Sequence, residues 1–394
     1  MNEFIQALSL GGTGPTIAIK DSIDIAGYAS TAASRALADA PPASQHAEVV
    51  ERLLEAGWHI VGKANMHELA FGMTGINDYT GTPQNPQDAA RIPGGSSSGS
   101  AAAVGLKLAD AALGTDTGGS IRGPAACCGV IGLKPTFGRV SRRGVAPRES
   151  TLDCVGPFAR EMRMIVAAMQ AITTGFDAQA AHASQAGASN VGIVQVDATS
   201  EILQAVTRAA DQADCRARTV ELAGLNAAFE AGLSVINAET SRAFGHLVET
   251  GKLGADLDAR LRAAAKTTAA QLEAAESVRR QFTAAVDHAL ESVDVLILPT
   301  LPALPITIDE ARGGTSVIAM SSLIRPFNLS GHPALSLPLP IMGSPLKAGL
   351  QIVGRKGADE QVCAIAARFE AALAGLKSVS EAAGIRRPND FLTE

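Results

Sequence analysis

Residues 91–136 read RIPGGSSSGSAAAVGLKLADAALGTDTGGSIRGPAACCGVIGLKPT, and they carry the strongest signal in the chain. The stretch contains two glycine–serine loops joined by an alanine-rich segment. Residues 100–108 are good helix formers, and the serines before them are suited to cap a helix N-terminus. Glycines in the second loop, 117–120, allow positive φ and close approach of a ligand. Such a loop can aim successive N–H groups at one point, as an oxyanion hole does.

More than one kind of site competes for this stretch. An isolated glycine–serine loop is most often an ordinary turn. A phosphate-binding loop needs Gly-Lys-Ser/Thr after its glycines, and that triplet does not occur in the sequence. Residues 95–99, GSSSG, match the nucleophile elbow of an α/β-hydrolase-like esterase with Ser97 as nucleophile. Histidines follow downstream, so residue order leaves this alternative open, although RIP at 91–93 is a poor strand and the second loop stays unexplained.

Outward from this centre, short apolar runs alternate with helical patterns. Residues 16–19 and 59–62 predict buried strands, and HAEVVERLLEAG between them predicts a helix ending at Gly57. The segment 190–290 contains two further strand patterns around a helix, then two long amphipathic helices. Strand patterns return from 291 to 355. We find no internal repeat or linker, and interpret 1–394 as a single α/β domain in which 190–290 forms a variable helical layer.

The composition of the chain argues against several classes of binding partner. The 394 residues are 46% hydrophobic and carry a net charge of −6, so no basic surface is expected to follow a phosphate backbone, and nucleic acid is not an expected partner. No apolar stretch approaches the roughly 20 residues of a spanning helix, and the N-terminus lacks a secretory n-region. Five irregularly spaced cysteines favour neither a disulfide framework nor a zinc site. We expect a cytoplasmic protein with no membrane partner and no metal.

Several ordered motifs together resemble the amidase-signature family. They are IAIKDSIDIAG, VGKANMHELAFG, TPQNP, GGSSSGSAAAV, GTDTGGSIR and GVIGLKPTFGRVSRRG, which lie between residues 17 and 144. The resemblance runs from about residue 16 to 160, returns weakly after 295, and is slight over 175–290. It implies a single domain with a large, mostly mixed central β-sheet covered by helices on both faces.

The resemblance also implies a Ser-Ser-Lys triad. Its nucleophile falls at Ser120, which ends TDTGGS. Its proton relay falls at Ser96, behind a cis peptide bond, and its base falls at Lys20 in IAIKD. The oxyanion hole would be formed by the backbone N–H groups of Thr117, Gly118, Gly119 and Ser120, and the supporting residues would be Ser97, Asp116 and Arg122.

Lysine can act as a base only when it is neutral, and its ordinary pKa is about 10.4. Ile17 and Ile19 beside Lys20 predict burial, which disfavours the charged form and lowers the pKa. Lys63, in VGKAN, is interpreted as structural because the family's catalytic lysine lies in the KD block.

The implied function is hydrolysis of a small carboxylic acid amide to the acid and ammonia or an amine, through a Ser120 acyl-enzyme and without a cofactor. The enzyme class is a hydrolase of linear amide C–N bonds, with a small-molecule amide as partner and a homodimer left open. The alternative within the family is the glutaminase (A-type) subunit of a tRNA-dependent amidotransferase. Only 19 residues precede Lys20, which favours the stand-alone enzyme. We expect residues 70–73 and parts of 190–330 to wall the pocket.

Overall fold

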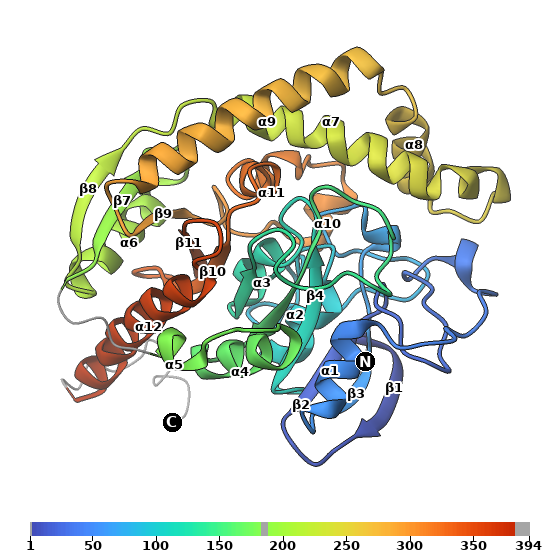
Figure 1. Cartoon of the computed structure of the whole chain (residues 1–394), viewed down its shortest axis with the longest axis horizontal. Coiled ribbons are helices and arrows are strands. Elements are labelled where there is room, and N and C mark those ends of the chain that lie inside the picture. The colour runs from blue at the N-terminus through green and yellow to red at the C-terminus, as the bar shows by residue number, and fades with distance from the viewer. Residues whose placement is uncertain (1, 183–187, 383–394) are drawn as a thin grey trace, which may run out of the picture.

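The computed structural model describes residues 2–182 and 188–382, and the domain expected over 1–394 is traced within these ranges. There, a mixed sheet of eleven strands crosses the molecule in the order β1-β3-β2-β4-β6-β5-β10-β11-β9-β7-β8 (Figure 1). Parallel pairs flank β2 and β7, and the remaining pairs are antiparallel. The expected mixed α/β sheet is therefore confirmed. The strands are β1 (Phe4–Gly11), β2 (Thr16–Lys20), β3 (His59–Ala64), β4 (Ala111–Asp116), β5 (Ile131–Lys134), β6 (Cys154–Ala159), β7 (Asn190–Val194), β8 (Arg216–Val220), β9 (Val295–Pro299), β10 (Ala334–Pro340) and β11 (Lys347–Val353).

Helices cover both faces of this sheet. They are α1 (Glu48–Glu55), α2 (Ser98–Gly105), α3 (Arg122–Cys128), α4 (Met162–Ile172), α5 (Ala178–His182), α6 (Ser200–Gln212), α7 (Leu225–Phe244), α8 (Ala255–Ala264), α9 (Ala269–Leu290), α10 (Ile308–Arg312), α11 (Arg325–Leu329) and α12 (Asp359–Ala382). Figure 1 shows α7 and α9 along one side of the sheet and α4, α5 and α12 along the other.

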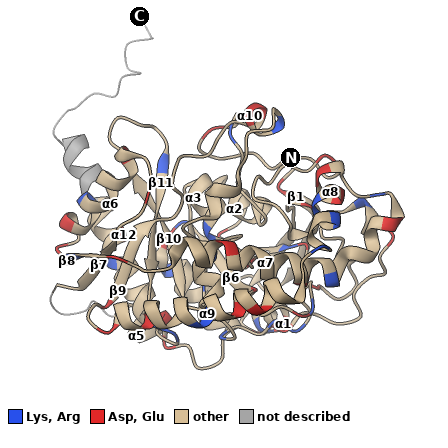
Figure 2. Ribbon diagram, turned by 90° about the horizontal axis from the view of Figure 1, so that it is seen from above, with Lys and Arg blue, Asp and Glu red and all other residues tan. Residues whose placement is uncertain are grey.

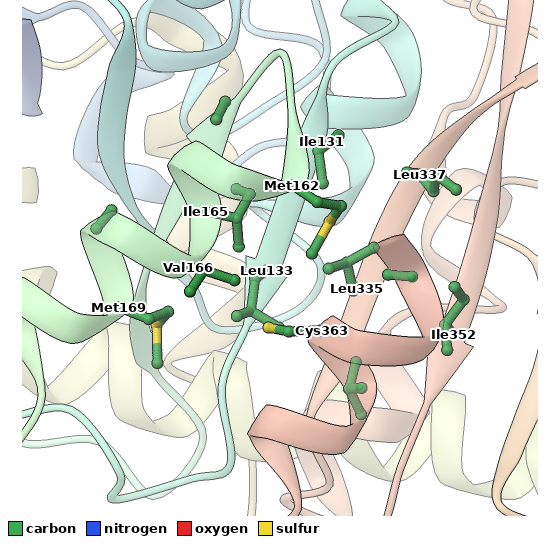
Figure 3. Packing of buried hydrophobic residues seen from close by; sticks show 14 of the residues in the cluster. Ile131, Leu133, Met162, Ile165, Val166, Met169, Leu335, Leu337, Ile352 and Cys363 are labelled. Carbon is green, nitrogen blue, oxygen red and sulfur yellow. The ribbon is translucent and has the colours of Figure 1, made fainter. Parts of the chain in front are cut away.

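The alternation of side chains along the strands separates two cores. In β9, Val295 and Ile297 belong to a core that also contains residues of α1, α4, α6 and α12, whereas Leu296 and Leu298 belong to a core with residues of α7, α8 and α9. Figure 3 shows the first core, where Met162 of α4 and Cys363 of α12 lie with sheet residues of β5 and β10. The helices α2 and α3 pack on the second face, over a smaller core. This second face carries the residues of the candidate site.

The central stretch differs from the sequence prediction in three ways. The helix expected over 100–108 is α2, which begins at Ser98 and ends at Gly105, and Lys107 has a positive φ of 62°. The Ser97 hydroxyl does not cap this helix. The segment between the two loops is not all helical, because the buried strand β4 occupies residues 111–116. The second loop is thus held at the end of a central strand.

The helix end predicted at Gly57 and the strand patterns predicted after residue 190 agree with the structure. Helix α1 is followed by Gly57 with a φ of 78°, as a C-terminal glycine requires. The segment 190–290 supplies β7 and β8 to the sheet edge with α6 between them, and α7, α8 and α9 follow, one helix more than the two expected. All five cysteines are free thiols. No helix in the described ranges is long and apolar enough to cross a membrane. Acidic and basic residues are interspersed along the outer helices (Figure 2).

Candidate active site

Lys20 ends β2, a strand paired on both sides, and its side chain is fully buried. Its Nζ lies 2.8 Å from Ser96 Oγ and 2.8 Å from Thr115 Oγ1. Burial lowers the pKa of Lys20 to about 7, while the negative charges of Asp153 and Asp116 act in the opposite direction. The direction of this shift agrees with the sequence argument, and it makes the neutral amine accessible near neutral pH.

Ser96 is held by its backbone just before α2. The Gly95–Ser96 peptide bond is cis, as the family resemblance implies. The Ser96 carbonyl accepts a hydrogen bond from the His67 N–H at 3.0 Å, and the side chain is fully buried. The contact of this carbonyl with His67 and that of the hydroxyl with Lys20 Nζ together define where the hydroxyl lies.

Ser97 serves the backbone of β4 rather than an open pocket. Its buried Oγ donates to the Thr115 carbonyl at 3.2 Å and accepts from the Thr115 N–H at 3.3 Å. Within the described residues, only an isolated bridge at Arg91 precedes α2 in this stretch, so the strand that an elbow requires is lacking. This geometry fits the supporting role assigned to Ser97 and not the esterase alternative.

Ser120 lies in the turn between β4 and α3 with 6% of its surface exposed. The turn requires glycine at position 119, where φ is +112° and a Cβ would come within 2.1 Å of Ile324 Cδ1. The Gly119 N–H already donates to Asp116 Oδ1 at 2.8 Å. One of the four expected oxyanion donors is therefore committed to the loop itself. The N–H groups of Thr117, Gly118 and Ser120 are left as the candidate donors.

Asp116 and Arg122 form a buried pair that holds this loop. The Asp116 carboxylate accepts hydrogen bonds from the Ile121 N–H and the Arg122 N–H as well as from the Arg122 side chain. The Asn328 amide donates to the same carboxylate at 2.7 Å. Burial would raise the pKa of Asp116, but the Arg122 charge and these hydrogen bonds outweigh it and hold that pKa well below its ordinary value. The carboxylate stays charged and organises the loop.

Two of the three residues of the expected triad are in direct contact in the structure, and the third is not. Lys20 and Ser96 are hydrogen-bonded directly, whereas Ser120 is linked to the same region through its carbonyl, which accepts from the Ser97 N–H at 3.3 Å. Among the described residues, no direct hydrogen bond joins the Ser96 and Ser120 hydroxyls.

Lys63 belongs to a separate cluster. It forms a buried ion pair with Asp21 at 3.0 Å and donates to the Ala29 carbonyl at 2.6 Å and the Ser30 hydroxyl at 2.9 Å. These contacts connect β3, which contains Lys63, to the loop at residues 29–30. The geometry therefore fits the structural role expected of Lys63.

Besides Asn328, the polar residues Thr115 and Asp153 of the site were not singled out from the sequence. Thr115 accepts from Lys20 Nζ, and it stands inside the motif GTDTGGS, two residues before the loop, but the sequence analysis assigns it no role. Asp153 accepts from the Thr117 hydroxyl at 2.9 Å, pairs with Arg142 at 3.0 Å and raises the pKa of Lys20. It comes 33 residues after Ser120, in TLDCVG, and nothing in its local pattern marks it.

Apolar side chains close on the glycine loop from distant segments. A Cβ on Gly118 would lie 2.8 Å from Ile236 Cδ1 of α7, and one on Gly123 would lie 3.1 Å from Met73 Cε. One of the two segments expected to wall the pocket, 190–330, therefore reaches the loop, and the other, 70–73, reaches the first turn of α3 directly after it.

Comparisons with known proteins give a consistent result. The family model described as Amidase matches residues 13–363. The A subunit of the glutamyl-tRNA(Gln) amidotransferase of Synechococcus sp. (strain RCC307) is 34% identical over 412 residues, which cover 91% of this chain and 83% of that protein. The crystal structure of the corresponding protein from Thermotoga maritima has a TM-score of 0.81 at 30% identity, covering 93% and 87% of the two chains. The structure of 6-aminohexanoate cyclic dimer hydrolase complexed with substrate has a TM-score of 0.85 at 25% identity, covering 95% and 90%.

Proposed function

The chain belongs to the amidase-signature family, and from that premise we propose that it hydrolyses a carboxylic acid amide through an acyl-enzyme on Ser120. The observation that carries this proposal is the 2.8 Å contact between the fully buried Lys20 Nζ and Ser96 Oγ. A neutral amine at that distance is a suitable base for a serine hydroxyl.

The base step uses both neighbours of Lys20. A neutral amine has two N–H donors and one lone pair, and Thr115 Oγ1, 2.8 Å away, accepts one N–H. The lone pair can then face Ser96, whose hydroxyl donates its proton to Nζ. Ser96 in turn takes the proton of Ser120 as the Ser120 oxygen attacks the amide carbonyl carbon. The missing Ser96–Ser120 hydrogen bond is expected to form when substrate is bound.

The negative charge that develops on the carbonyl oxygen needs fixed donors. The N–H groups of Thr117, Gly118 and Ser120 are proposed for this role, while Asp116 holds the Gly119 N–H and keeps the turn in shape. Lys20 returns its proton through Ser96 to the departing nitrogen, the C–N bond breaks, and the Ser120 ester remains. Water then attacks the ester carbonyl carbon and gives a proton to the same relay. The bond between that carbon and Ser120 Oγ breaks, the relay returns the proton to Oγ, and the acid is released.

A second candidate is the glutaminase subunit of an amidotransferase, and the names of the relatives favour it. Two of the proteins compared are named as the A subunit of glutamyl-tRNA(Gln) amidotransferase. In that function the same triad would release ammonia from glutamine for use in a complex. The expectations of a single small-molecule partner and of no nucleic acid in the assembly gain no support from these names, and they depend on the assay below.

The experiment measures ammonia release by the purified chain from a panel of primary amides that includes glutamine, with EDTA present. ATP, tRNA and partner proteins are then added in turn. We expect activity from the chain alone, undiminished by EDTA, and loss of it in Ser120→Ala. Activity that requires the added partners would replace the stand-alone function by the second candidate.

A matched pair of variants tests the nucleophile itself. A fluorophosphonate probe should label the native chain and Ser97→Ala at Ser120, and should not label Ser120→Ala. Labelling of Ser97 with Ser120 untouched would show that the esterase alternative is right.

A further inference from the structure

Arg325 is a buried arginine beside the glycine loop. It begins α11, and only 6% of its surface is exposed. A Cβ on Gly118 would lie 3.6 Å from Arg325 Nε, so the guanidinium group borders one of the candidate oxyanion donors. No step of the mechanism above uses it.

Most of the donors of this guanidinium group are uncommitted. An arginine carries five N–H donors. Here Nη1 donates to the Phe229 carbonyl at 3.3 Å and Nη2 donates to Ser321 Oγ at 2.6 Å. The group lies over the Phe229 ring at 4.3 Å. Its Nε is buried and has no partner among the described residues, and none of their carboxylates forms an ion pair with it.

Arg122, on the same loop, shows how this protein satisfies an arginine that serves structure alone. Its side chain pairs with Asp116 through two nitrogens, and its remaining donors reach protein oxygens. Those remaining acceptors are the Ile324 carbonyl, the Gln351 side chain and the Asn328 side chain. Both arginines are buried, but Arg122 forms an ion pair with a carboxylate and Arg325 forms none with the described residues.

The surroundings of Arg325 are short of negative charge. Burial lowers its pKa to about 10; the exposed Glu230 partly opposes this, and the nearby Arg260 adds to it. Arg260 of α8 also acts with burial to lower the pKa of His67, so its positive charge acts on both His67 and Arg325. A buried charge without a partner destabilises a folded protein, and a bound anion would remove that penalty.

We propose that Arg325 binds a carboxylate of the substrate, so that the preferred amides carry a carboxylate a few bonds from the scissile carbonyl. This inference rests on the proposed function of the same site. A carboxylate offers two oxygens that match the arginine fork, and such pairs are stronger than neutral hydrogen bonds. Because Arg325 Nε lies only 3.6 Å from a Cβ placed on Gly118, we expect a short spacer, as in the monoamides of three- to five-carbon dicarboxylic acids. Glutamine is the member of this class with an added ammonium group.

The test compares two amides that differ mainly in charge, glutaramate and pentanamide, by kcat/KM. We expect the native enzyme to prefer glutaramate. Arg325→Met should lower kcat/KM for glutaramate by about 10- to 100-fold, the size of a charge-assisted hydrogen bond, and leave that for pentanamide nearly unchanged. Arg325→Lys should keep part of the preference. Arg355→Met is the control, because Arg355 donates to the carbonyls of Leu290 and Val293 and should leave the ratio unchanged.

A binding measurement separates this inference from the proposed function. Glutarate should raise the Tm of the native protein and of Ser120→Ala, but not that of Arg325→Met. Equal losses for both amides, a native preference for pentanamide, or a glutarate shift that survives in Arg325→Met would overturn the role of Arg325. Hydrolysis of pentanamide alone would overturn this inference and leave the proposed amidase. If glutarate raises Tm through Arg325 but no amide is hydrolysed, the role of Arg325 is kept and the proposed amidase function is overturned.

Discussion

Lys20 and Lys63 are both buried lysines, but their partners differ. Lys20 faces two hydroxyl groups, whereas Lys63 faces the Asp21 carboxylate. We expect Lys20→Ala to lower kcat by at least 10²–10⁴-fold, the usual contribution of a general base. Lys63→Ala should leave kcat within about tenfold but lower Tm, because it strands a buried carboxylate. Steady-state kinetics and thermal unfolding of the two variants check this, and equal losses of kcat would contradict the assignment.

The pH dependence of the reaction should report the Lys20 amine. Because burial lowers its pKa to about 7, kcat/KM is expected to rise with pH through that value as the amine loses its proton. Asp153 raises the pKa of Lys20, so Asp153→Asn should move the midpoint to lower pH. Asp153→Asn also changes the hydrogen bond from the Thr117 hydroxyl, which is expected to lower kcat. The midpoint of the pH profile does not depend on the size of kcat, so it still reports the pKa of Lys20. A midpoint that moves upward would exclude this coupling.

At the scale of elements, α2 is held against the N-terminal strands at one glycine. A Cβ on Gly99 would come within 2.4 Å of the Glu3 carbonyl oxygen and 2.5 Å of the Asn65 backbone. Backbone atoms on both sides cannot yield as a flexible side chain would, so Gly99→Ala should displace α2 and with it Ser96. We expect a lower Tm and a loss of kcat greater than tenfold. Gly245→Ala is the control, since the nearest atom to its Cβ is Ser241 Oγ at 3.5 Å and its φ is −58°.

The sequence predicted those helices and strands whose apolar residues stand out clearly from neighbouring charged or turn-forming residues. Helix α1 alternates charged and apolar residues at helical spacing, and β2 and β3 are apolar runs between turn residues. Strand β4, AALGTD, was missed because alanine and glycine carry no strand preference, and only its burial between β2 and β6 makes it a strand. Strand β1 was missed because it is half-exposed at the sheet edge and has few buried positions.

The same distinction applies to the site. Residues within one motif, such as Asp116 and Arg122, could be assigned roles because their contacts are local. Arg325 and Asn328 reach the loop from more than 200 positions away, and nothing in RPFNL indicates where its arginine will lie. Long-range approach is decided by how the helices dock on the sheet, which composition and periodicity do not specify.

For the whole molecule, Lys20 should lower stability. The pKa of this group is about 7 in the fold and ordinarily 10.5, so the unfolded chain binds the extra proton between these values. Stability therefore rises with pH across that window, and the full penalty is present below pH 7. Lys20→Met should raise the free energy of unfolding, by a few kcal/mol more at pH 6 than at pH 9. Urea unfolding at both pH values measures this, and a gain that grows with pH would refute it.

The contacts of Arg122 set a condition on when the site can exist. Its partners Asn328 and Gln351 lie 206 and 229 residues further along the chain. During synthesis, the nucleophile therefore leaves the ribosome long before the groups that hold its loop. We expect the fluorophosphonate probe to ignore nascent chains halted before residue 351 and to label released ones; labelling of halted chains would refute this. An incomplete chain would then hold Ser120 in an unreactive state throughout synthesis, so it would not attack the carbonyl groups of other molecules.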